Sequence, residues 1–163
     1  MSDDLLVGVS ISHLGLSVPD IDAAVAWYTT VLGFTLLAGP AVIDDDSPAA
    51  ETAREVYGPH WHSMRQAHLS AGNGVGLELF EFLRPAETAV DHRFRPWHPG
   101  LFHFCVVSHD VAGLVERIID NGGTQSTSIR RPSSEYSMCY CRDPWGNPLE
   151  INDRSYEQAH ART

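Results

Sequence analysis

Basic residues and cysteines are scarce in this sequence, and each shortage excludes a class of function. Lysine and arginine together number 11 against 21 aspartates and glutamates, which gives a formal net charge of −10 at pH 7. Nucleic acids and anionic membrane surfaces are bound by clustered Lys and Arg, so neither is an expected partner. The three cysteines form no Cys-x-x-Cys pair, and we expect them to be small buried side chains in a reducing compartment.

Long apolar runs are absent as well. No stretch approaches the ~18 apolar residues that a membrane span requires, and the N-terminal residues Met1-Ser2-Asp3-Asp4 are acidic where a signal peptide would be basic. Hydrophobic residues make up 43% and charged residues 20% of the 163 positions. This balance is typical of a globular chain with one domain or two modules that share a core. We therefore predict a cytoplasmic protein.

The sequence contains an internal repeat. Residues 12–34, SHLGLSVPDIDAAVAWYTTVLGF, align with residues 102–124, FHFCVVSHDVAGLVERIIDNGGT. Each segment opens with an apolar stretch that holds one histidine, His13 or His103. An aspartate suited to capping a helix follows, and after it come apolar residues at helical spacing and a terminal glycine. The repeat predicts a strand followed by a helix in each half.

The repeat continues to the end of each half. Both halves finish with a glutamate between two aliphatic residues, in Leu77-Glu78-Leu79 and in Leu149-Glu150-Ile151. Residues 40–62 have no counterpart in the second half, so we interpret them as an irregular insertion. Each half then has the order βαβββ, and neither half could bury its sheet alone.

These segments set the predicted boundaries. The first module covers residues 7–83, a proline-containing linker 84–100, the second module 101–152 and a loose polar tail 153–163. The expected helices are 20–32 and 110–121, and the expected strands are 7–18, 34–38, 63–70, 75–83, 101–107, 124–130, 136–142 and 147–152. The predicted fold class is α+β, with two tandem βαβββ modules that form a concave mixed sheet.

Two histidines and two glutamates occupy equivalent positions in the two halves. An imidazole or a carboxylate within an apolar strand needs a polar partner to offset its lost hydration. If pseudo-twofold symmetry brings the halves together, the concave sheet would surround a metal site with four ligands: His13, Glu78, His103 and Glu150. Two imidazoles and two carboxylates leave open positions on a divalent metal, as a catalytic site requires. Zn, Ni, Mn, Co and Fe all accept these donors, so the identity of the metal stays open.

Three strings carry a resemblance to a known family: SHLGLSVPDIDAAVAWYTTVLGF, FHFCVV and CRDPWGNPLEI. They resemble the vicinal oxygen chelate superfamily, which includes glyoxalase I, methylmalonyl-CoA epimerase, extradiol dioxygenases and the fosfomycin and bleomycin resistance proteins. The resemblance covers residues 9–37 and 75–152 and leaves out the insertion. It implies paired βαβββ modules that cup a metal, with one ligand from the first and one from the last strand of each module. Those positions are His13, Glu78, His103 and Glu150.

The ligand set narrows the choice of reaction. The isomerase and lyase members that this sequence resembles use four such ligands, so the resemblance implies a metal-dependent lyase or isomerase of the glyoxalase I or epimerase type. Such an enzyme polarises vicinal oxygens of a small-molecule carbonyl substrate and shifts a proton. Glu150 is the first candidate for the base and Glu78 the second. The alternatives are an Fe(II) extradiol-type dioxygenase and a non-catalytic drug- or metabolite-binding resistance protein. The relatives also imply a homodimer.

Other side chains are weaker candidates. Glu51 and Glu55 in the insertion could reach the site on a lid, but a solvated surface explains them more simply. Residues 57–65 could cover the site and bind an organic anion, or form a packed loop, and Tyr140 could form a polar wall. Two phenylalanines share the strand parity of Glu78 and could floor the cavity: Phe80 and Phe82. Five histidines are expected at the surface or in structural roles: His68, His92, His98, His109 and His160.

Overall fold

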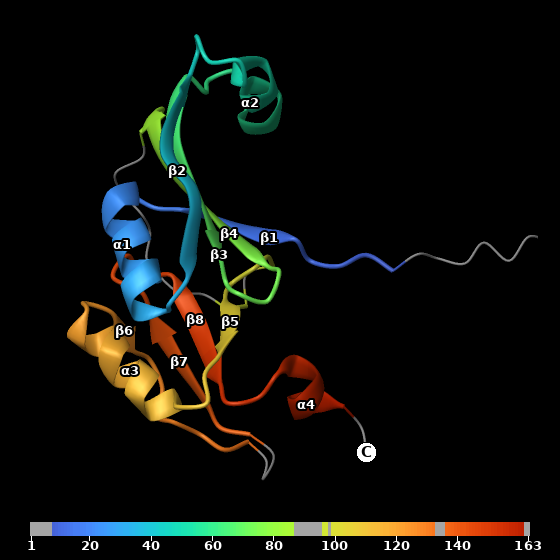
Figure 1. The fold of residues 1–163 in the computed structure, drawn as a ribbon, viewed down its shortest axis with the longest axis vertical. Coiled ribbons are helices and arrows are strands. Elements are labelled where there is room, and N and C mark those ends of the chain that lie inside the picture. Colours follow the sequence, from blue (N-terminus) through green and yellow to red (C-terminus); the bar gives the residue numbers. More distant parts are fainter. Residues whose placement is uncertain (1–7, 87–95, 98, 133–135, 162–163) are drawn as a thin grey trace, which may run out of the picture. The chain divides into compact units, whose positions relative to one another are not determined.

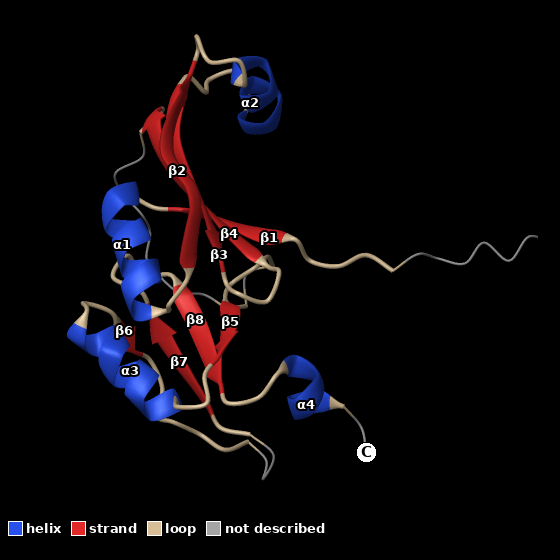
Figure 2. Ribbon diagram, in the orientation of Figure 1, coloured by secondary structure: helices blue, strands red, loops and turns tan. Residues whose placement is uncertain are grey.

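Two successive units make up the chain, Met1–Thr88 and Ala89–Thr163. The structure, a computed structural model, describes residues 8–86, 96–97, 99–132 and 136–161 (Figure 1). The predicted linker 84–100 lies largely outside the described residues, as do His92 and His98. Each unit contains one four-stranded mixed sheet and its own helices (Figure 2).

The first unit has the predicted βαβββ order with one additional helix. Its elements are β1 (His13–Ser17), α1 (Ile21–Val31), β2 (Thr35–Asp44), α2 (Ala50–Tyr57), β3 (Ser63–Ser70) and β4 (Gly76–Arg84). The strand order in the sheet is β1-β4-β3-β2. The first and last strands, β1 and β4, pair in parallel, whereas β3 is antiparallel to both of its neighbours.

The second unit repeats this topology. Its elements are β5 (Phe104–Val107), α3 (Val111–Asp120), β6 (Thr124–Gln125), β7 (Met138–Arg142), β8 (Pro148–Asn152) and α4 (Tyr156–His160). The strand order is β5-β8-β7-β6, with β5 parallel to β8 and the other pairs antiparallel. The tandem βαβββ modules predicted from the repeat are therefore confirmed.

The two repeated helices form for the reasons that the sequence indicates. Asp20 accepts a hydrogen bond from the Ala23 amide at 3.0 Å, and Asp110 accepts one from the Gly113 amide at 2.9 Å. These contacts satisfy amides that have no partner within the helix. Both helices then bury one apolar stripe against their own sheet.

Strand alternation divides each sheet into an apolar face and a polar face. In β4 the side chains of Leu77 and Leu79 are buried, and Glu78 between them points to the opposite face. In β8 the same pattern places Glu150 opposite the buried Leu149 and Ile151. The fold therefore presents both glutamates on the faces that the repeated helices leave uncovered. The joining of the two sheets into one concave surface stays a prediction.

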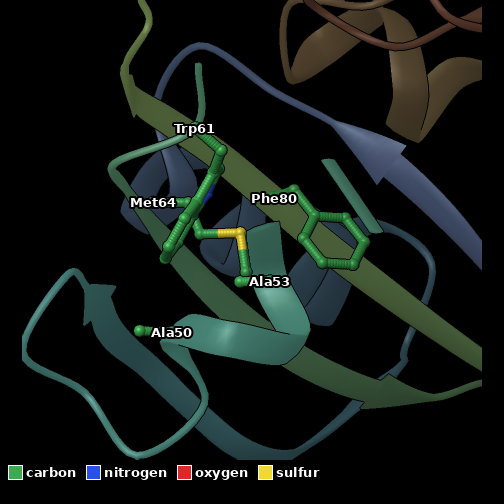
Figure 3. Close-up of a cluster of buried hydrophobic side chains, with 5 residues drawn as sticks. All are labelled: Ala50, Ala53, Trp61, Met64 and Phe80. Carbon is green, nitrogen blue, oxygen red and sulfur yellow. The ribbon is translucent and has the colours of Figure 1, made fainter. Parts of the chain in front are cut away.

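The insertion is the main correction to the predicted fold. Residues 40–62 are regular rather than irregular, because β2 extends to Asp44 and α2 follows it. This segment has a small core of its own, in which Trp61 is 1% exposed (Figure 3). The buried members of the core are Ala50, Ala53, Trp61, Met64 and Phe80. Burial of these apolar side chains explains why the extended hairpin and the short helix are stable together.

Smaller corrections concern the ends of elements. The first strand starts at His13 rather than residue 7, and β6 ends at Gln125, with one isolated bridge from Arg130 to Met138 beyond it. The tail is not loose throughout, since α4 forms with a capping box at Ser155. Cys139 and Cys141 are buried as expected, but Cys105 is exposed because β5 is an edge strand. No described helix is long and apolar enough to cross a membrane.

Candidate functional site

The first half-site lies on three neighbouring strands of the first unit. In the sheet register Glu78 of β4 is paired with Gly15 of β1, two positions after His13, and with His68 of β3 on its other side. His13 Nε2 lies 3.4 Å from Glu78 Oε2, and His68 Nδ1 lies 3.2 Å from Glu78 Oε1. The carboxylate of Glu78 is thus held between two imidazoles, one at each oxygen.

These three side chains share one pocket of about 390 Å³. Ser12 from the chain before β1, Leu37 of β2 and Gly76 at the start of β4 also line it. Leu37 is 67% exposed, whereas Glu78 is largely covered. The pocket combines apolar walls with a charged carboxylate and two imidazoles, a composition typical of small-molecule sites.

The insertion helix lies beside this half-site. Tyr57 at the end of α2 has its ring centroid 6.0 Å from that of Phe80 and 5.3 Å from that of Phe82. Burial of the Tyr57 hydroxyl and the negative charge of Glu78 raise the pKa of Tyr57 above its usual value. Phe80 packs in the core of the insertion and does not line this pocket. That Phe80 and Phe82 floor a cavity shared by the two halves stays a prediction.

The second half-site repeats the geometry of the first. Glu150 of β8 is paired with Cys105 of β5, two positions after His103, and with Tyr140 of β7 on its other side. His103 Nε2 lies 3.1 Å from Glu150 Oε2, and the Tyr140 hydroxyl donates to the same oxygen at 3.0 Å. The side-chain amide of Asn152, in the orientation that suits its neighbours, donates to Glu150 Oε1 at 3.3 Å.

The second half-site is less exposed to solvent than the first. The side chains of His103 and Glu150 are 24% and 14% exposed, against 52% and 23% for His13 and Glu78. Burial, together with the charge and hydrogen bond of Glu150, raises the pKa of Tyr140 to about 12, so its hydroxyl remains a donor at neutral pH. His103 Nδ1 is buried and has no hydrogen-bond partner among the described residues.

The donor spacing in both pairs suits a divalent metal. Two ligand atoms that each lie ~2.1 Å from an ion are ~3.0 Å apart at an octahedral angle and ~3.4 Å apart at a tetrahedral one. The observed separations between Nε2 and Oε2, 3.4 Å and 3.1 Å, fall at these values. Within the described residues, no set of three or more His, Cys, Asp or Glu side chains is arranged to hold a metal. Each half offers one imidazole and one carboxylate at this spacing, and in the first half a second imidazole, that of His68, lies at the other oxygen of Glu78.

Two partners of the glutamates were not among the predicted ligands. His68 was expected at the surface or in a structural role, and Tyr140 only as part of a wall, yet each contacts a glutamate directly. The hairpin turns carry the signal that identifies them. A tight turn at residues 143–147 places Tyr140 opposite Glu150, and the turn that joins β3 to β4 places His68 opposite Glu78 in the same way.

The remaining candidates lie elsewhere. Glu51 and Glu55 are exposed, as a solvated surface predicts, and they lie on α2. In the stretch 57–65, Arg65 is bound by Asp22 and Glu81 at 2.8 and 3.2 Å and is not available to a ligand. Three further histidines have no contact with either glutamate in the described structure: His62, which binds Asp45, His109, which is exposed, and His160, which packs against tyrosine rings.

The duplicated topology and the paired residues define a class of protein, and the sequence comparison agrees with it. Residues 10–151 match the family model of the Glyoxalase/Bleomycin resistance protein/Dioxygenase superfamily. The chain belongs to this superfamily. The resemblance noted from the sequence motifs is therefore confirmed.

Individual relatives are more distant. The chain is 27% identical over 148 residues to a 2-epi-5-epi-valiolone epimerase from Actinomyces sp., a match that covers 88% of this chain and 78% of the epimerase. A glyoxalase family protein from Bacillus cereus has a similar structure, with a TM-score of 0.72, 21% identity, and coverage of 93% of this chain and 97% of that one. The fosfomycin resistance protein FosX from Listeria monocytogenes, solved as a mutant with Mn(II) and 1S,2S-dihydroxypropylphosphonic acid, has a TM-score of 0.57 at 16% identity. That match covers 93% of this chain and 95% of the FosX chain.

Proposed function

We propose that the protein is a metal-dependent isomerase of the epimerase type. In this proposal one divalent ion is bound by the two pairs together, His13 with Glu78 and His103 with Glu150. The supporting observation is the identical placement of the pairs, with each histidine two positions before the residue that faces its glutamate. Four such donors leave open positions for a substrate. The similarity to an epimerase favours this reaction over the lyase chemistry of glyoxalase I.

The substrate class follows from the donor set. When bound, the ion supplies a Lewis acid for a carbonyl oxygen and the oxygen on the neighbouring carbon, which acidifies the proton on that carbon. A small molecule with a carbonyl beside a hydroxyl therefore suits the site. The pocket at His13, His68 and Glu78 has room for a compact polar molecule of this kind.

The two carboxylates supply the proton transfers. Epimerisation removes a proton from one face of a carbon and returns a proton to the other, which takes two groups able to exchange a proton. The chain offers one glutamate in each half for this purpose. Glu150 is the first candidate for the base, because its half-site is the better shielded from water. In that role it would leave the ion when the substrate binds. Tyr140 and Asn152 fix the orientation of Glu150 while it acts.

Proton exchange at carbon tests this function. The full chain would be loaded with Mn²⁺, Ni²⁺, Co²⁺, Zn²⁺ or Fe²⁺ and incubated in D₂O with a panel of hydroxy-ketones, acyl-CoA esters and 2-oxoaldehyde–thiol adducts. We expect metal-dependent deuterium incorporation at the carbon next to the carbonyl, detected by NMR. Absence of exchange from every substrate with every metal would contradict the proposal.

The dioxygenase alternative requires a separate measurement. An extradiol-type enzyme would consume oxygen when Fe²⁺-loaded protein, prepared anaerobically, meets a catechol. Tight ligand binding without exchange or oxygen uptake would instead identify a resistance protein that only sequesters its ligand. These three outcomes distinguish the proposed isomerase from both alternatives.

A further inference from the structure

The two units place different residues at one equivalent position. His68 of β3 stands directly opposite Glu78, and Tyr140 of β7 stands directly opposite Glu150. Because both strand pairs are antiparallel and the facing side chains point to the same side, each residue reaches the carboxylate across the sheet. The repeat therefore assigns one side chain per half to the glutamate, beyond the pairs that carry the proposed function.

The two residues contact different oxygens of their glutamates, relative to the oxygen that faces the histidine of the pair. His68 Nδ1 lies at Glu78 Oε1, so Oε2 faces His13 alone. In the second unit the Tyr140 hydroxyl and His103 Nε2 both lie at Glu150 Oε2, and Asn152 reaches Oε1. A carboxylate that bonds to a fixed neighbour cannot rotate freely, and this restriction lowers the entropy lost when it binds an ion.

We propose that His68 and Tyr140 are positioning residues of the metal site, each holding the glutamate of its own half in the orientation that binds the ion. The inference rests on the proposed function, because it assigns partners to the glutamates that are proposed as ligands. It differs from that function in what it requires: the metal site would exist without these residues but would bind its ion more weakly. Outer partners of this kind typically change metal affinity by about 10–100-fold.

The structure offers a clean substitution at one of the two positions. The His68 side chain is partly exposed, so its replacement leaves no large buried cavity. His68→Leu removes the nitrogen at Glu78 Oε1, while His68→Asn places an amide nitrogen close to the position of Nδ1. A matched control is His62→Leu, which removes another partly exposed imidazole of the same unit, one that contacts Asp45 rather than Glu78.

Binding of Mn²⁺ to the full chain, measured by isothermal titration calorimetry, tests the inference. We expect His68→Leu to raise the Kd by about 10–100-fold, His68→Asn to restore most of the affinity, and His62→Leu to leave it unchanged. Tyr140→Phe should raise the Kd by a similar factor. The absorption spectrum of the Co²⁺-loaded protein should change with His68→Leu and not with His62→Leu, because it reports the arrangement of the ligands. Circular dichroism checks that each variant is folded.

The outcomes distinguish a failure of this inference from a failure of the proposed function. If the wild-type chain binds Mn²⁺ and His68→Leu and Tyr140→Phe bind it equally well, the positioning roles are wrong and the proposed metal site stands. If His62→Leu weakens binding as much as His68→Leu, the effect is not specific and the inference is likewise wrong. If the wild-type chain binds none of Mn²⁺, Ni²⁺, Co²⁺, Zn²⁺ or Fe²⁺, the proposed function itself fails and the inference fails with it.

Discussion

The two units share a topology and a strand register but differ in their surroundings. In both, a histidine at the start of the first strand and a glutamate on the last strand meet on the face that the helix leaves uncovered. The first unit adds a long β2–β3 hairpin and α2, whereas the second joins β7 to β8 by a tight turn and has the better buried pair. The histidine–glutamate pair that the units share is what binding of one ion by both halves requires. The insertion and the unequal burial of the pairs can adapt each half to a separate task.

The same substitution in each half tests whether the two glutamates have separate tasks. Glu150→Gln should lower kcat for deuterium exchange by about 10²–10⁴-fold, the usual contribution of a positioned base. Glu78→Gln should have a smaller effect on kcat and a larger effect on metal affinity. Steady-state kinetics at saturating metal would measure kcat, and titration with metal would measure the affinity. Equal kcat values for Glu150→Gln and the wild type would remove Glu150 from the role of base.

The insertion core should make the stability of the first unit depend on one side chain. Trp61 is almost fully buried beside α2, so Trp61→Ala should lower the free energy of unfolding by about 3–5 kcal/mol. Urea titration followed by circular dichroism would measure this loss. A loss below 1 kcal/mol would show that the insertion core is not what stabilises the extended hairpin.

The helix caps of the two halves should contribute equally to the stability of the protein. Asp20→Ala and Asp110→Ala each remove a side-chain acceptor at the start of a helix, and each should cost about 0.5–2 kcal/mol. The two losses, measured by thermal denaturation of the single variants, should agree within error. A large loss at one position and none at the other would indicate that the halves use their helices differently.

The smallest expected effect concerns acid sensitivity of the first unit. The hydrogen bond and charge of Arg65 hold the pKa of Asp22 below its usual value of 3.8. A carboxyl whose pKa is depressed by folding stabilises the fold above its unfolded pKa and loses that contribution as the pH falls through the folded value. Arg65→Met should therefore flatten the stability curve below about pH 4, only slightly because Asp22 is exposed. If the urea midpoint of Arg65→Met falls as much as that of the wild type between pH 6 and pH 3, this prediction is wrong.

Much of this architecture could be predicted from the sequence because the same sequence pattern occurs twice in the chain. Helix starts at Asp20 and Asp110 and the alternation around Glu78 and Glu150 are local signals that packing did not override. The helix α2 was missed because the short segment Ala50–Tyr57 gains its stability from packing against Trp61 and Phe80, which lie outside the helix.

The candidate site was predicted only as far as the repeat extends. The pairing of His13 with Glu78 and of His103 with Glu150 follows from equivalent positions in the two halves. His68 escaped the prediction because a comparison of the halves places tyrosine, not histidine, at its counterpart. Identifying it requires the register of the β3–β4 hairpin, which a search for identical residues does not consider.

Metal stoichiometry tests most directly whether the two histidine–glutamate pairs bind a single ion. The chain, purified without chelator and saturated with Mn²⁺, would be analysed by mass spectrometry of its metal content, beside His13→Ala and His103→Ala. If both pairs serve a single ion, the wild type holds one Mn²⁺ per chain and either substitution removes it. Two ions per chain, or one ion that survives His103→Ala, would show that the pairs act independently.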